Sequence, residues 1–82
     1  MSTLHCFDTA NFDNYSIAKK AADKAGMLFY SERRPTCCKQ YHFEITAETP
    51  AQVSILDLII LATTAHMDQA LYKNKLSHYI YN

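Results

Sequence analysis

Apolar and polar side chains alternate most regularly in residues 40–45, QYHFEI. Tyr41, Phe43 and Ile45 occupy every second position, and polar residues stand between them. This period of two predicts a strand that turns its aromatic side to the core and its polar side to water.

Two more segments have the composition of strands. Residues 27–34, MLFYSERR, come just before the alternating segment, and a short connection around Pro35–Cys37 would join the two in an antiparallel hairpin. Residues 3–7, TLHCF, form an apolar-rich run that ends at Asp8 and predict a first strand.

The spacing changes to that of a helix in residues 14–26, NYSIAKKAADKAG. Asp13 or Asn14 can cap its start, and Gly26 can end it. One face of this helix is nearly all alanine, so it can pack closely against whatever it covers.

The start of a second helix is predicted by Thr49-Pro50-Ala51-Gln52. Thr49 suits the N-cap, Pro50 the first helical position and Gln52 the third position of a capping box. The apolar periodicity continues to about Tyr72, and residues 75–81, KLSHYIY, then predict a last strand.

The predicted order is β-α-β-β-α-β in one domain, residues 1–82, which indicates an α+β sandwich of ferredoxin-like type with two helices on one face of an antiparallel-rich sheet. In that arrangement we expect the first and third strands to be parallel neighbours and the fourth to lie antiparallel beside the first. The alternative has three strands and a second helix that runs almost to the C-terminus.

The second helix is more apolar than a sheet-covering helix needs to be. One stripe, formed by Val53, Leu56, Ile60, Met67 and Leu71, suits the sheet. A second stripe on the opposite side must pack on the first helix or on another chain. Its members are Ile55, Leu58, Ile59, Ala62 and Ala65.

Four residues of that second stripe and three tyrosines are therefore candidates for contact with a protein partner, since exposed tyrosine is enriched at interfaces. For each of them, packing inside the chain is the competing interpretation. The candidates are Ile55, Leu58, Ile59, Ala62, Tyr72, Tyr79 and Tyr81.

Size and charge narrow the classes of function. A chain of 82 residues, 49% of them hydrophobic, can fold but is small enough to benefit from burial against a partner or a second copy, so a homodimer is a live possibility. Eight basic and eight acidic residues cancel, which disfavours nucleic acid as a partner. No segment has the length of a membrane span or the pattern of a leader, and three cysteines without a framework spacing fit a reducing compartment, so we expect a cytoplasmic protein without a membrane partner.

Cysteines and histidines offer the only candidate metal or redox chemistry. In the predicted topology five of them gather at one edge of the sheet, and thiolates and imidazoles are ligands that zinc prefers. No C-x-x-C or H-x-x-x-H pair is present, so this site is a weak candidate and no cofactor is expected. Its members are His5, Cys6, Cys37, Cys38 and His78.

Enzymatic chemistry has less support still. A single glycine rules out a glycine-rich phosphate loop, and no cysteine, histidine and carboxylate share the spacing of a nucleophile and its base. RNA binding is a further alternative, because the predicted order is similar to that of the RNA-recognition module. In that module the stacking aromatics face solvent, whereas the alternation here turns Tyr41 and Phe43 inward.

The function that remains is that of a non-catalytic protein-binding module, an inhibitor or adaptor of a larger complex. A phage or mobile-element antagonist of a host defence system such as CRISPR-Cas is one version, which rests on chain size alone. A small Cys/His metal-binding or redox-sensing domain is the alternative, and an RNA-binding domain is the second.

Overall fold

The computed structural model describes residues 2–36, 38–65 and 67–82. Three strands and three helices follow one another in the order β-α-β-β-α-α. They are β1 (Thr3–Thr9), α1 (Phe12–Ala25), β2 (Leu28–Arg33), β3 (Tyr41–Ala47), α2 (Pro50–Thr64) and α3 (Gln69–Tyr81).

The strands form one antiparallel sheet in the order β1-β3-β2, so β3 is central and β1 and β2 are its edges. The hairpin predicted between β2 and β3 is confirmed, and the backbone N–H of Arg34 closes it by donating to the carbonyl of Gln40 at 2.7 Å. The expected parallel pairing of the first and third strands is wrong. Because α1 carries the chain back across the sheet, β2 runs in the direction of β1 and the hairpin then reverses β3 between them.

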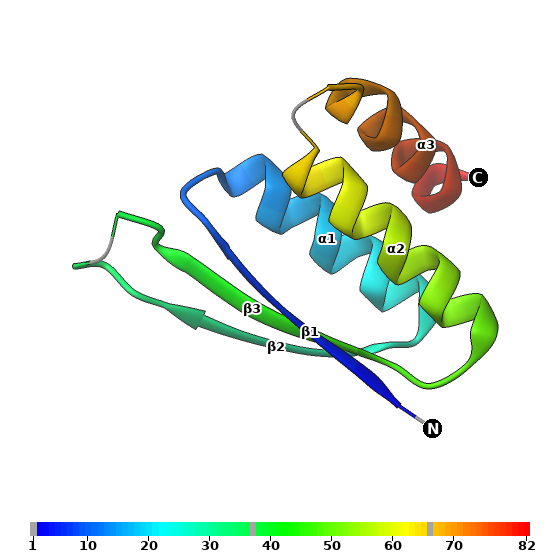
Figure 1. Cartoon of the computed structure of the whole chain (residues 1–82), viewed down its shortest axis with the longest axis horizontal. Helices are drawn as coiled ribbons and strands as arrows, with labels where there is room; N and C mark the ends of the chain where they lie inside the picture. The colour runs from blue at the N-terminus through cyan, green and yellow to red at the C-terminus, as the bar shows by residue number, and fades with distance from the viewer. Residues whose placement is uncertain (1, 37, 66) are drawn as a thin grey trace.

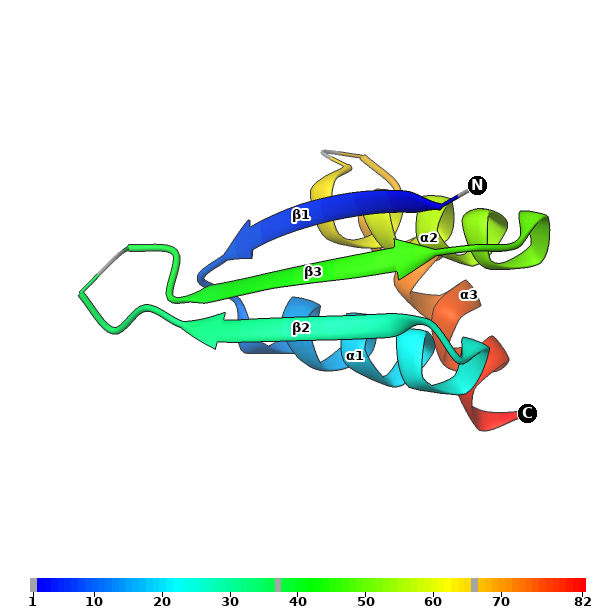
Figure 2. The ribbon, with the colours of Figure 1, turned by 90° about the horizontal axis from the view of Figure 1, so that it is seen from below.

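All three helices lie on the same side of the sheet (Figure 1). Helices α1 and α2 cover the strands, and α3 lies over α1 and α2 on the side away from the strands. Figure 2, which is turned by 90° and views the molecule from below, shows the strands of the sheet with no helix in front of them. One face of the sheet is therefore the floor of the core, and the other, the open face, is uncovered.

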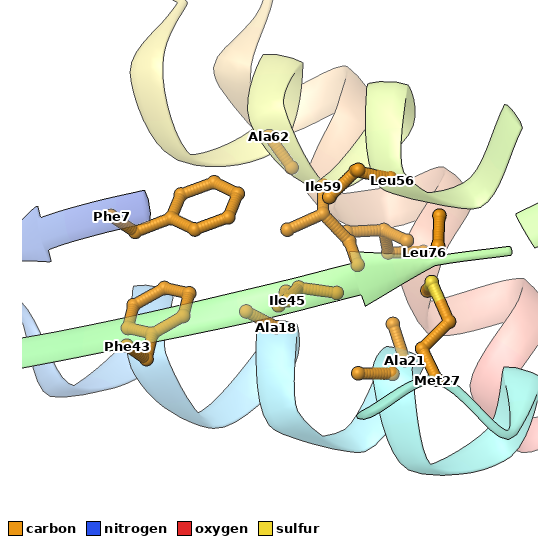
Figure 3. Packing of buried hydrophobic residues seen from close by; sticks show 12 residues of the cluster. Phe7, Ala18, Ala21, Met27, Phe43, Ile45, Leu56, Ile59, Ala62 and Leu76 are labelled. Carbon is orange, nitrogen blue, oxygen red and sulfur yellow. The ribbon is translucent and has the colours of Figure 1, made fainter. Parts of the chain in front are cut away.

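The core forms between the inner face of the sheet and the helices (Figure 3). Phe7 and Phe43 stack at 4.6 Å between ring centroids, and Ile45 lies fully buried beside them. The alanines predicted for the first helix, Ala18 and Ala21, are also fully buried. Their small side chains let α1 approach the sheet closely.

Helix α1 begins and ends with side-chain and backbone caps. Its N-cap is Asn11, two or three residues before the expected Asp13 or Asn14, and the Asn11 carboxamide oxygen accepts from the N–H groups of these two residues. Gly26 ends the helix as predicted, with φ of 71°, and Met27 N–H donates to Ala22 at 2.9 Å. Glycine adopts this left-handed conformation without a Cβ clash.

Helix α2 begins where the sequence places it. The Thr49 hydroxyl accepts from Gln52 N–H at 3.1 Å, and Pro50 occupies the first turn. The side chain of Gln52 reaches back to Glu48 N–H and also donates to the Ala25 carbonyl at 3.0 Å. This second bond ties the start of α2 to the end of α1.

Helix α2 ends at Thr64, about eight residues before the end expected from the sequence. The hydroxyls of Thr63 and Thr64 bond back to carbonyls one turn earlier, and Ala65 is extended. Asp68 then adopts φ of 63°, which turns the chain back along α2. The helix expected to continue to about Tyr72 thus stops at Thr64, and its last expected residues belong to the next helix, α3.

The last strand expected at residues 75–81 is also wrong, because these residues belong to α3. Tyr72, Leu76 and Ile80 are four residues apart and turn toward the core, with Leu76 fully buried. The ferredoxin-like order is therefore not confirmed. The α+β class holds, and the three-strand count matches the alternative, although its C-terminal helix is broken in two.

Lysines of α1 fasten the end of α3. Lys20 Nζ is 3.2 Å from the Tyr81 hydroxyl, and Lys24 Nζ donates to the Ile80 carbonyl at 3.3 Å. Cations at the C-terminal end of a helix interact favourably with its dipole. The lysines on the polar face of α1 thus help to hold α3 in place.

We expect Leu76→Ala to lower the free energy of unfolding by about 2–5 kcal/mol, because it leaves a cavity between α3 and the rest of the core. Leu71→Ala, on the same helix but half-exposed, should cost less than about 1 kcal/mol. Urea denaturation of both variants followed by circular dichroism provides the measurement. Equal losses for the two variants would contradict the docking of α3 described above.

Candidate protein interface on the open face of the sheet

The open face carries three large apolar side chains that no helix covers. Leu4 on β1 is 57% exposed, Leu28 on β2 is 66% exposed and Tyr30 is 56% exposed. Leu4 and Leu28 are both paired in register with Thr46 of β3, so they lie in one row across the sheet. Neighbouring exposed apolar side chains can mark an interaction site, so this row is a candidate contact surface.

The next two rows change from apolar to charged. Cys6 and Tyr30 flank Glu44, and Asp8 and Glu32 flank His42. The open face thus has an apolar end near the start of β1 and a polar end near the hairpin.

His42 is the centre of the polar end. Its Nδ1 is 2.9 Å from Asp8, and its Nε2 is 2.9 Å from Glu44. The side chains around it leave His42 only 8% exposed, although it lies on the uncovered side of the sheet. Both ring nitrogens are therefore engaged with carboxylates.

This geometry favours a charged imidazole. An ionised carboxylate only accepts hydrogen bonds, so both ring nitrogens of His42 must carry protons to donate to Asp8 and Glu44. The hydrogen bond to Glu44 and then that to Asp8 raise the pKa of His42 above its usual 6.5, against smaller opposing effects of burial and of Arg34. When it is protonated, His42 is a cation that hydrogen-bonds to two carboxylates.

Arg34 extends the network to β2. Its guanidinium is 3.3 Å from Glu32 and 3.7 Å from Asp8. The polar end therefore contains three carboxylates, of Asp8, Glu32 and Glu44, against the cations of Arg34 and His42, which leaves a surplus of negative charge.

The apolar stripe predicted to bind a partner lies elsewhere, and half of it is inaccessible. Ile59 and Ala62 are fully buried between α2 and its neighbours, so these two predicted contact residues are not accessible to a partner in this structure. Ile55 and Leu58 are half-buried against the same core. The cause is α3, which packs on this side of α2 and covers a stripe that would be free if the last segment were a strand.

The three candidate tyrosines all lie on α3, on the helical side of the molecule. Tyr72 is half-buried against the core. Tyr79 and Tyr81 contact lysines of α1, with 5.4 Å from the Tyr79 ring centroid to Lys24 Nζ. Tyr81 remains 70% exposed. Tyr79 and Tyr81 therefore link α3 to α1.

The candidate metal ligands do not converge in the part of the chain that the structure describes. His5 and Cys6 are neighbours on β1 and therefore point to opposite faces. Cys38 is an exposed residue of the hairpin connection, before the start of β3, and His78 is exposed on α3. Cys37 lies outside the described residues. Among residues 2–36, 38–65 and 67–82, no three His, Cys, Asp or Glu side chains are placed to share an ion.

The aromatic residues of β3 face the helices, as the alternation predicts. Phe43 is fully buried, and Tyr41 is half-buried on the same side. Nucleic-acid stacking needs aromatic rings on the accessible face, where the central strand instead presents Glu44 and His42 and a single exposed ring, that of Tyr30, lies on the edge strand β2. This arrangement disfavours the RNA-binding alternative.

Sequence reasoning placed His42 beside Glu44 on the outer face but missed Asp8 and Arg34. The register that brings Asp8 opposite His42 depends on which strand lies beside β3. A detectable signal was the repetition of one pattern: both edge strands place an apolar residue and an acidic residue four positions apart, as Leu4 and Asp8 and as Leu28 and Glu32.

Comparisons with protein-family models, curated proteins and solved structures found no match to this chain. Within its described part, no helix combines the length and the apolar character needed to cross a membrane.

We expect the His42 network to make stability depend on pH. Because the pKa of His42 is higher in the folded chain than in the unfolded one, its contribution is present below about pH 6.5 and is lost as the pH rises through the folded pKa. The wild type should therefore be more stable relative to His42→Gln at about pH 5.5 than at about pH 9. Urea denaturation of both proteins at the two pH values checks this, and a difference that does not change with pH would refute it.

Proposed function

We propose that this chain is a non-catalytic protein-binding module that binds its partner through the open face of the sheet. The observation that carries this proposal is the group of exposed apolar side chains in two neighbouring rows, Leu4 and Leu28 in one and Tyr30 in the next, on the face of the sheet that no helix of the described chain covers. Burial of such side chains contributes about 25 cal/mol per Å² of apolar surface, so a partner that covers them gains affinity. The module acts as an inhibitor or adaptor, by blocking or bridging surfaces of a larger complex.

The charge of the open face favours a partner other than a second copy. Two copies packed face to face with their polar ends together would bring the carboxylates of Asp8, Glu32 and Glu44 toward their counterparts, and the opposite orientation would set these carboxylates against apolar side chains. Like charges at an interface are unfavourable. A matching partner offers apolar side chains opposite Leu4 and Leu28, flanked by lysine or arginine near Asp8.

The size of the open face limits what it can do alone. Three strands about 4.8 Å apart and about seven residues long give roughly 300 Å² in projection. A standard stable interface buries about 800 Å² on each partner. The proposed interface must therefore continue past the open face, and the projecting hairpin is the adjacent surface on which it can do so.

Leu28→Asp tests this proposal in cells that express the tagged chain. Leu28 is 66% exposed, so the variant should remain folded, with a stability change within about 1 kcal/mol, while it loses any protein that copurifies with the wild type. Met67→Asp is the matched control, because Met67 is 79% exposed but lies at the turn between α2 and α3.

Affinity purification with quantitative mass spectrometry gives the result, and circular dichroism checks the fold. Loss of a copurifying protein in Leu28→Asp but not in Met67→Asp is the expected outcome. The proposal is wrong if both variants retain the same proteins as the wild type. Recovery of a second copy of the chain alone would replace the foreign partner with a homodimer.

A further inference from the structure

The β2–β3 hairpin projects beyond the helices (Figure 1), so near its end the inner side of the sheet is also uncovered. A cavity of about 220 Å³ lies there between α1 and the hairpin. We call it the Arg33 pocket. It is lined by Tyr15, Ser31, Glu32, Arg33 and Tyr41.

Aromatic rings form one wall of the Arg33 pocket. Tyr15 and Tyr41 stack with 5.3 Å between ring centroids, and the Tyr15 hydroxyl is 3.4 Å from the Ser31 hydroxyl. Phe12, at the first position of α1, lies 5.8 Å from Tyr41 and is 57% exposed, so it extends the aromatic surface outward. Tyrosine and arginine are the residues most enriched where interfaces gain their affinity.

Arg33 is a cation without a counter-ion among the described residues. Its guanidinium lies 5.8 Å from the centroid of the Tyr41 ring, and it makes no ion pair there. The next residue, Arg34, behaves in the opposite way, because it reaches the other face of the sheet and pairs with Asp8 and Glu32. Arg34 is thus paired with carboxylates on the open face, whereas Arg33 lies beside the Tyr41 ring on the inner side.

We propose that the Arg33 pocket receives an acidic side chain of the protein partner, an inference that rests on the proposed protein-binding function. A guanidinium binds a carboxylate through two parallel hydrogen bonds, and the rings of Tyr15 and Tyr41 can cover the methylene groups of the incoming side chain. The volume of about 220 Å³ suits one side chain, because pockets for small-molecule ligands measure about 300–1,000 Å³. Glu32 also lines the pocket, but its side chain belongs to the open face, where its carboxylate is 3.3 Å from Arg34, so it offers little repulsion to a carboxylate beside Arg33.

Nuclear magnetic resonance titration with two capped amino acids tests this inference directly. The probes are N-acetyl-glutamate N-methylamide and its neutral counterpart, N-acetyl-glutamine N-methylamide. We expect the glutamate probe to shift the signals of Ser31, Arg33 and Tyr41 saturably at millimolar concentration, and the glutamine probe to bind about tenfold more weakly. Arg33→Ala should abolish the response, whereas Arg34→Ala, the matched control, should retain it.

The inference is overturned if the two probes give equal shifts, if neither shifts these residues up to about 10 mM, or if Arg33→Ala responds like the wild type. Leu28→Asp separates it from the proposed function, because that variant should still bind the glutamate probe. If the wild type does not bind the glutamate probe but Leu28→Asp loses the partner, the inference about the Arg33 pocket is wrong and the proposed interface on the open face is supported. If the probe binds but Leu28→Asp keeps the partner, the Arg33 pocket is supported as a carboxylate site and the proposed interface on the open face is wrong.

Discussion

The apolar character of α2 is the constraint on which the rest of the structure depends. Apolar side chains stand nearly all the way round this helix, so a single neighbouring layer cannot bury them. Leu56 and Ile59 are almost completely buried only because the sheet lies on one side of α2 while α1 and α3 lie on the others. The C-terminal segment therefore forms a third layer over the helices, where Leu76 completes the core.

Placing the last segment over the helices has a consequence on the far side of the molecule. Three helices are stacked on one face of three strands, and nothing in the described chain remains to cover the other face. Leu4 and Leu28 stay exposed there beside a charged group centred on His42. The helices cover one face of the sheet and leave the other face exposed. This arrangement fits a surface that binds a protein better than an enclosed ligand pocket.

The candidate interface could be predicted only in part. The alternation around Tyr41 and Phe43 assigned His42 and Glu44 to the outer face, and that assignment is confirmed. The contact of His42 with Asp8 could not be deduced, because it joins residues 34 positions apart through a strand order that no local pattern specifies. The stripe containing Ile59 was recognised as needing a cover, but the sequence did not say whether that cover was α3 or another chain.

Local chemistry determined most of the elements: the cap at Thr49, the stop at Gly26 and the alternation of β3 are readable because each depends on neighbouring residues alone. Residues 75–81 were different, since Tyr79, Ile80 and Tyr81 suit a strand as well as a helix. Tertiary structure decided between the two, because as a helix this segment places Tyr72, Leu76 and Ile80 on one face against α1 and α2. By itself the sequence determined which side chains avoid water. Only the packing of distant segments decided which of them the chain covers and which, like Leu4 and Leu28, it leaves exposed.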